Sequence, residues 1–93
     1  MINYYKVILS NKNFYKEINL NSEMKTISVG TEMGIGVRLR KEYFFGDILL
    51  TFTNMGDVWN VSCSDNLYFN LGDIRKLSLT KLSHGSEVNV CYQ

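Results

Sequence analysis

The sequence predicts an all-β protein, a two-sheet β-sandwich of about 9–11 short strands. Three observations lead to this prediction. Apolar and polar residues alternate with a period of two along most of the chain. Clusters of Asn, Gly, Asp and Ser interrupt the alternation about every ten residues, as turns do in sandwiches and barrels. No segment of 11 or more residues has the spacing of an amphipathic helix.

The first half of the chain begins with two alternating runs on either side of the polar stretch "SNKN", which indicates a hairpin. In the second run Phe14, Ile18 and Leu20 fall on one face, which we expect to be buried. Two shorter strands follow, separated by a glycine-rich loop. The expected strands of this half are residues 4–10, 14–20, 25–29 and 37–40.

The second half alternates in the same way, with turns expected at "NMGD" and "SHGS". The expected strands are residues 47–53, 58–63, 66–70, 75–80 and 87–92. The faces expected to be apolar are Ile48, Leu50 and Phe52; Trp59, Val61 and Cys63; and Leu77 with Leu79. The lone histidine, His84, lies in a turn without a partner, and we interpret it as a structural turn residue.

Length and charge limit the function classes. The 93 residues fit one domain, residues 1–93. The net charge of +1 argues against a dedicated nucleic-acid binder, which usually carries a clear basic excess. The chain has neither a signal peptide nor an apolar run of about 20 residues, so we expect a cytoplasmic domain without direct membrane contact. Because the last expected strand runs almost to Gln93, we expect the domain to be the N-terminal part of a longer protein.

No arrangement of residues points to catalysis or to a metal. The two cysteines lack CxxC spacing, and strand parity directs Cys63 inward and Cys91 outward, so we expect no disulfide. No nucleophile–base pair and no metal-ligand set stands out. We therefore expect a protein that is not an enzyme and that has no catalytic residues, no metal ligands and no cofactor.

The stretch "SVGTEMGIGVRL" (28–39) contains three glycines between Gly30 and Gly36. A phosphate-binding loop of the nucleotide type needs a lysine after the glycines and a helix whose N-terminus faces the phosphates. Here the strand "VRLR" follows instead, and Glu32 adds a negative charge. We expect a loop with positive φ angles that links strands, rather than a nucleotide site.

Four stretches resemble a known family in order and spacing. They are "ISVGTE" (27–32), "VRL" (37–39), "SDNLYFN" (64–70) after a strand containing Trp59, and "KLSHGSEVNV" (81–90). The chain resembles a forkhead-associated (FHA) domain, a β-sandwich of the FHA/SMAD-like type that often binds phosphothreonine. It is most similar to the degenerate FHA-like domains at the N-terminus of FtsK/SpoIIIE-type ATPases of Gram-positive type VII secretion. ATP binding and membrane anchoring belong to other parts of those proteins, and this chain has no Walker motif.

The phosphate-binding residues of the family are mostly replaced. Thr31 stands where the family has its phosphate-binding arginine, and "FFGD" (44–47) replaces the Ser-Arg-x-His stretch. A neutral hydroxyl cannot supply the charge-assisted contact of an arginine. Thr31→Arg is the substitution expected to recover phosphate affinity. The resemblance implies a protein or peptide contact at the loops; the candidate residues are Thr31, Glu32, Phe44, Phe45, Ser64 and Asn66.

The sequence therefore predicts a non-catalytic protein–protein interaction domain whose partners are other components of a secretion machine. Because "EYFF" places three aromatic residues in succession, at least one ring must face outward. Two alternatives stay open. One is an OB-like barrel that binds single-stranded nucleic acid through its aromatic residues. The other is an FHA adaptor that depends on phosphothreonine.

Overall fold

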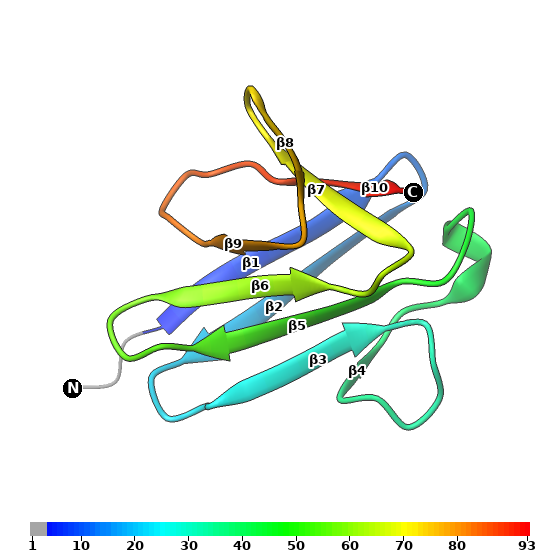
Figure 1. Ribbon diagram of the computed structural model, residues 1–93. Helices are drawn as coiled ribbons and strands as arrows, with labels where there is room; N and C mark the ends of the chain where they lie inside the picture. Colours follow the sequence, from blue (N-terminus) through cyan, green and yellow to red (C-terminus); the bar gives the residue numbers. More distant parts are fainter. Residues whose placement is uncertain (1–3) are drawn as a thin grey trace.

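The computed structural model describes residues 4–93, which form an all-β fold (Figure 1). The elements are β1 (Tyr4–Asn11), β2 (Phe14–Asn21), β3 (Thr26–Gly30), β4 (Val37–Arg38), the 3₁₀ turn η1 (Lys41–Tyr43), β5 (Leu49–Asn54), β6 (Trp59–Cys63), β7 (Leu67–Leu71), β8 (Ile74–Leu77), β9 (Leu79–Lys81) and β10 (Asn89–Tyr92). Within the described residues no helix is long and apolar enough to cross a membrane.

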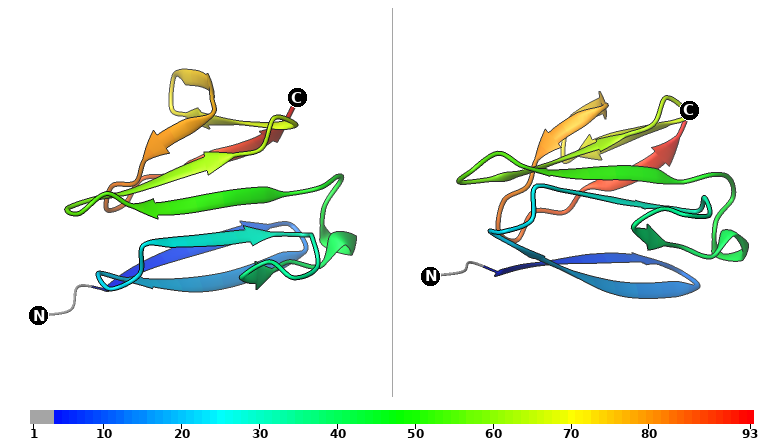
Figure 2. Two further views of the ribbon diagram at one scale, coloured as in Figure 1. Left: turned by 60° about the horizontal axis from the view of Figure 1, so that its bottom comes forward. Right: turned by 90° about the horizontal axis from the view of Figure 1, so that it is seen from below.

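The strands form three sheets that pack as a β-sandwich. One sheet has five strands in the order β4-β3-β5-β6-β9, one has three in the order β10-β7-β8, and β1 and β2 form a separate hairpin. All pairs are antiparallel except β3 and β4, which are parallel. Figure 2 shows the hairpin on one side of the molecule and β3, β5 and β6 on the other. The predicted sandwich architecture is confirmed at this level.

The core lies between these layers and is built from the faces that alternation predicts. Its buried apolar residues are Ile18, Leu20, Val29, Leu39, Ile48, Leu50, Phe52, Trp59, Val61, Leu67 and Phe69. On β2 the buried positions are two residues apart, as expected for a strand with one face toward the core. Phe14 is half-buried against the same cluster. The faces predicted for β2, β5 and β6 are therefore confirmed.

The prediction of one continuous strand at residues 75–80 is wrong. The structure has two strands there, β8 in the three-stranded sheet and β9 in the five-stranded sheet, with Ser78 between them. Lys76 has a positive φ of 59°, and the β7–β8 register shifts before it. Leu77 packs against the core and Leu79 is exposed, because the chain passes from one sheet to the other at Ser78, between these two residues. The point at which a chain passes from one sheet to another is decided by tertiary packing, not by local alternation.

The predicted inward position of Cys63 is confirmed, whereas Cys91 is half-buried rather than exposed. Both are free thiols. Cys63 packs against the core, whereas Cys91 is half-buried on β10 and accepts a hydrogen bond at 3.8 Å from Asn70 Nδ2. Burial and the nearby charge of Asp65 raise the pKa of the Cys63 thiol, which keeps it protonated and unreactive at neutral pH.

Candidate functional site

The loops that carry the predicted contact residues gather at one end of the sandwich, around residues 44–48 (Figure 1). The backbone N–H of Thr31 donates to the carbonyl of Ile48 at 3.0 Å. The side-chain amide of Asn66 donates to the carbonyl of Asp47 at 2.9 Å. The β3–β4 loop and the β6–β7 turn are therefore both attached to the segment that precedes β5.

Thr31 lies in the core, not on the surface. Its side chain is 0% exposed. Its Oγ1 accepts a hydrogen bond from the backbone N–H of Ile48 at 3.1 Å and lies 3.5 Å from the Ile48 carbonyl. Ile48 lies just before β5. The Thr31 hydroxyl oxygen accepts the hydrogen bond from its N–H, as the carbonyl of a neighbouring strand would do within a sheet. The expectation that Thr31 contacts a partner is wrong, because its side chain is buried in the core.

Gly30 and Gly34 of this loop are explained by the conformation and packing of the backbone. A Cβ at Gly30 would overlap the carbonyl oxygen of Ile48, so glycine is required where β3 approaches the segment before β5. Gly34 has a φ of 82°, a conformation that favours glycine at the tip of the loop. The expected positive φ is confirmed at Gly34. Close approach, rather than ligand binding, accounts for Gly30.

Phe45 is the most exposed large apolar side chain of the described residues. It is 93% exposed, and its ring packs edge-on against Tyr92 with a centroid distance of 5.6 Å. The Tyr92 hydroxyl donates to the Gly46 carbonyl at 2.8 Å and accepts from the Gly46 N–H at 3.0 Å. Two hydrogen bonds from the last strand therefore fix the backbone beside Phe45. The expectation that at least one aromatic residue of "EYFF" faces outward is confirmed.

Phe44 points the other way. It is half-buried and packs edge-on against Phe14 at a centroid distance of 5.1 Å. Phe14 also stacks with Tyr43 at 6.0 Å, and the Asn11 side chain donates to the Tyr43 carbonyl at 2.8 Å. These contacts attach the end of the β1–β2 hairpin to η1. Phe44 therefore acts mainly in packing.

Ser64 and Asn66 form a polar pair next to Asp47. The Ser64 hydroxyl donates to Asn66 Oδ1 at 2.5 Å. Ser64 is half-buried and Asn66 is exposed. The Gln93 N–H donates to the Asn66 carbonyl at 3.0 Å, so the last described residue also belongs to this end of the molecule. The amide of Asn66 is thus oriented from both sides.

Two further residues of the β3–β4 loop complete the surface. Glu32 is exposed, as predicted, and Met33 is 81% exposed. The exposed or half-exposed residues at this end are called the loop surface below and are Glu32, Met33, Phe45, Ser64 and Asn66. This set combines two large apolar side chains with a polar pair and a carboxylate, a mixture typical of protein contacts.

Sequence reasoning missed two members of this arrangement. Tyr92 lies within the strand predicted at residues 87–92, but its contact with Gly46 spans 46 residues. Met33 lies within the glycine-rich stretch, where the sequence analysis assigns it no role. A single sequence gives no signal for a pairing at such a distance, whereas Met33 could have been noted as an apolar residue in a polar glycine-rich loop.

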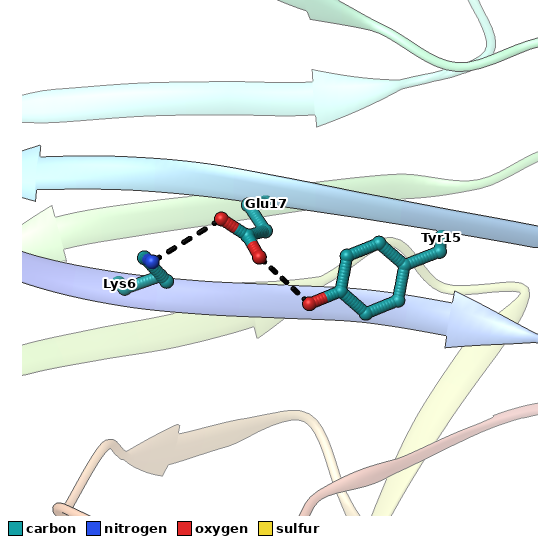
Figure 3. A network of polar contacts seen from close by, with 3 residues as sticks. All are labelled: Lys6, Tyr15 and Glu17. Carbon is teal, nitrogen blue, oxygen red and sulfur yellow. Dashed lines mark hydrogen bonds and ion pairs between the residues drawn. The ribbon is translucent and has the colours of Figure 1, made fainter.

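A second polar cluster lies on the outer face of the hairpin (Figure 3). Glu17 forms an ion pair with Lys6 at 3.2 Å and accepts a hydrogen bond from the Tyr15 hydroxyl at 2.7 Å. The hydrogen bond from Tyr15 and the charge of Lys6 lower the pKa of Glu17, and the same hydrogen bond raises the pKa of Tyr15. All three side chains are exposed, so the cluster is a cross-strand surface contact.

The described residues contain no group of three or more His, Cys, Asp or Glu side chains that could hold a metal ion. Searches against models of known families, against curated proteins and against solved structures give no match.

Proposed function

We propose that the chain is a non-catalytic protein–protein interaction domain that binds its partner through the loop surface, without dependence on phosphate. The observation that carries the proposal is the position of Phe45. The ring is 93% exposed and the backbone beside it is fixed by Tyr92, so binding has to order the Phe45 side chain but not the loop that carries it. Aromatic side chains of this kind dominate the energy of protein interfaces.

The chemistry of the surface supports a contact without phosphate. Its five residues include the carboxylate of Glu32 and neither lysine nor arginine. The Thr31 hydroxyl is already bonded to Ile48 in the core and is not available to a ligand. A doubly charged phosphate would meet repulsion and few donors here. This disfavours the phosphothreonine-dependent adaptor.

We further propose that the domain is a degenerate FHA-like domain in the cytoplasmic N-terminal part of an FtsK/SpoIIIE-type ATPase of type VII secretion, where it contacts other components of the machine. The four sequence stretches named above support this assignment, and the all-β sandwich agrees with it at the coarser level of fold class. ATP binding and membrane anchoring would reside in other parts of the parent protein.

The OB-like alternative receives less support. An OB fold is a five-stranded, partly closed barrel. The described residues form three sheets of two, three and five strands, and the net charge is only +1. A salt-dependent interaction with oligonucleotides would be the observation in its favour.

Photo-crosslinking in cells tests the interaction. A photoreactive phenylalanine analogue is placed at position 45 of the full-length protein, and a control carries it at Met55, which is exposed in the β5–β6 turn at the other end of the sandwich. We expect a discrete crosslinked protein at position 45 and none at position 55. Phe45→Ala should weaken binding of that partner by about tenfold or more and leave the fold intact. Equal crosslinking at both positions would refute the proposal that the partner binds at the loop surface.

Paired peptide arrays test the absence of phosphate dependence. The same threonine peptides are offered to the purified chain with and without phosphate on the threonine. We expect no preference for the phosphorylated member of any pair. Strong and selective binding of phosphothreonine peptides would support the adaptor function instead.

A further inference from the structure

A large groove lies between β1 and β10, and Phe45 of the loop surface lines one end of it. Its volume is about 1430 Å³, and its floor includes the core side chains of Leu20, Phe52 and Trp59. Pockets for small molecules usually measure about 300–1,000 Å³. The groove is therefore large enough for a polypeptide segment, and its floor favours apolar side chains.

The two walls of the groove are strand edges. Among the described residues β1 pairs only with β2, and β10 pairs only with β7. Residues of both strands line the groove, including the exposed side chains of Ile8 and Val90. An unpaired edge presents a row of backbone N–H and C=O groups, and an extended segment placed between two such edges would pair with both.

The direction of the two strands defines the direction of such a segment. The C-terminal ends of β1 and β10 meet the same stretch, because the Asn11 side chain bonds to Tyr43 and the Tyr92 hydroxyl bonds to Gly46. Figure 1 shows both strands running toward that end. A segment antiparallel to both would therefore begin at this end. The part of β1 along the groove, residues 5–11, matches a segment of about seven residues.

Charge complementarity indicates what the far end of the segment contains. The exposed carboxylates of Asp57 and Glu87 line the groove. The Lys6 ammonium, which also lines it, is paired with Glu17. Because Asp57 lies in the β5–β6 turn, opposite the 43–46 end in Figure 1, a basic residue at the C-terminal end of the segment would meet these acids.

We propose that the groove binds an extended segment of a partner protein as an antiparallel strand between β1 and β10. The segment has apolar side chains at alternate positions, facing the floor, and a lysine or arginine at its C-terminal end. The groove shares Phe45 with the loop surface, but the proposal rests on the two strand edges and on Asp57 and Glu87, and the substitutions below test these separately from Phe45.

The test uses a fluorescent peptide of about seven residues that alternates Thr and Val and ends in Arg. One control has the same composition without alternation, and a second ends in Thr. Binding to the chain is measured by fluorescence anisotropy. We expect the alternating peptide to bind at least about tenfold more tightly than the scrambled one, because only alternation directs every Val to the floor.

Proline substitutions locate the binding edge. The β1–β2 register closes with a two-residue turn between Asn11 and Phe14, so the N–H groups of Ile8 on β1 and Asn19 on β2 point to opposite outer edges of the hairpin. Ile8→Pro removes a donor facing the groove and should weaken the alternating peptide about tenfold. Asn19→Pro should leave its affinity within about twofold. Amide exchange across β1 and β2 verifies that both variants fold.

Charge substitutions provide a readout that does not depend on strand pairing. Asp57→Asn and Glu87→Gln change exposed loop residues, and together they should weaken the Arg-ended peptide about two- to fivefold while leaving the Thr-ended peptide unchanged.

Four results would overturn the proposal. The first is equal or absent binding of the alternating and scrambled peptides, and the second is an equal effect of the two proline substitutions. The third is a dimer of the chain that Ile8→Pro dissociates. The fourth is protection of the β1 and β10 amides from exchange, without peptide, in a longer natural form of the protein. The third result assigns the groove to a second copy, and the fourth assigns it to a segment of the same polypeptide.

Discussion

The hydroxyl of Thr31 is predicted to hold the start of β5 in place, and Thr31→Val is the change that isolates it. Valine keeps nearly the same volume but cannot accept the hydrogen bond from the Ile48 N–H, which is 3.1 Å from Oγ1. Because the Thr31 side chain is 0% exposed, water cannot replace the lost acceptor without a rearrangement.

The magnitude follows from the burial of the N–H group. A buried donor left without a partner costs about 1–3 kcal/mol. For a domain of this size each kcal/mol lowers Tm by about 4–8 °C, so a loss near the middle of the range lowers Tm by about 10 °C. Thr31→Ser keeps the acceptor and removes one methyl group, which should cost about 1 kcal/mol.

Two assays separate these contributions. Thermal or urea unfolding gives the loss of stability, and amide exchange at Ile48 reports the hydrogen bond itself. We expect faster exchange of the Ile48 amide in Thr31→Val and unchanged exchange in Thr31→Ser. The exposed neighbour provides a control, since Glu32→Gln should change stability by less than about 0.5 kcal/mol. A Val variant as stable as the natural chain, with a protected Ile48 amide, would refute the reasoning.

Three further predictions concern single contacts. Gly30→Ala should lower the free energy of unfolding by about 1–3 kcal/mol in urea titrations, because the new Cβ overlaps a backbone carbonyl; an unchanged midpoint would contradict that close approach. Tyr92→Phe should cost about 1–2 kcal/mol and increase exchange at the Gly46 amide, since both hydrogen bonds to Gly46 are lost while the ring remains; unaltered exchange would show that the hydroxyl does not fix this loop. Because the pKa of Glu17 is lowered, its contact stabilises the fold above the ordinary carboxyl pKa and is lost as the pH falls through the folded value. An NMR titration should place the Glu17 midpoint below its usual value, and Tyr15→Phe should raise it; a midpoint unaffected by Tyr15→Phe would contradict the hydrogen bond.

The candidate site was only partly predictable from the sequence. Of the candidate contact residues, Glu32, Phe45 and Asn66 are exposed and Ser64 is half-buried. Thr31 is buried, although the residue that follows a strand can turn either toward a partner or toward the core. Thr31 turns toward the core because its hydroxyl accepts the hydrogen bond from the Ile48 N–H, and Ile48 lies 17 positions farther along the chain.

What the sequence alone determined is local. Alternation with a period of two placed the buried faces of β2, β5 and β6, since side chains on a strand point to opposite sides in turn. Asn and Gly marked the β5–β6 turn, where Gly56 has a φ of 100° and its N–H bonds to Asn54 Oδ1. These features depend on residues within a few positions of one another.

What only the tertiary structure decided joins residues far apart in the chain. The close approach of Gly30 to Ile48, the bonds from Tyr92 to Gly46 and the division of residues 74–81 between two sheets all depend on which strands become neighbours. The two open edges beside the groove have the same origin, because an edge is left unpaired by the arrangement of whole sheets. Alternation specifies which face of a strand is buried, but the strand that pairs with it is selected by packing across the whole fold.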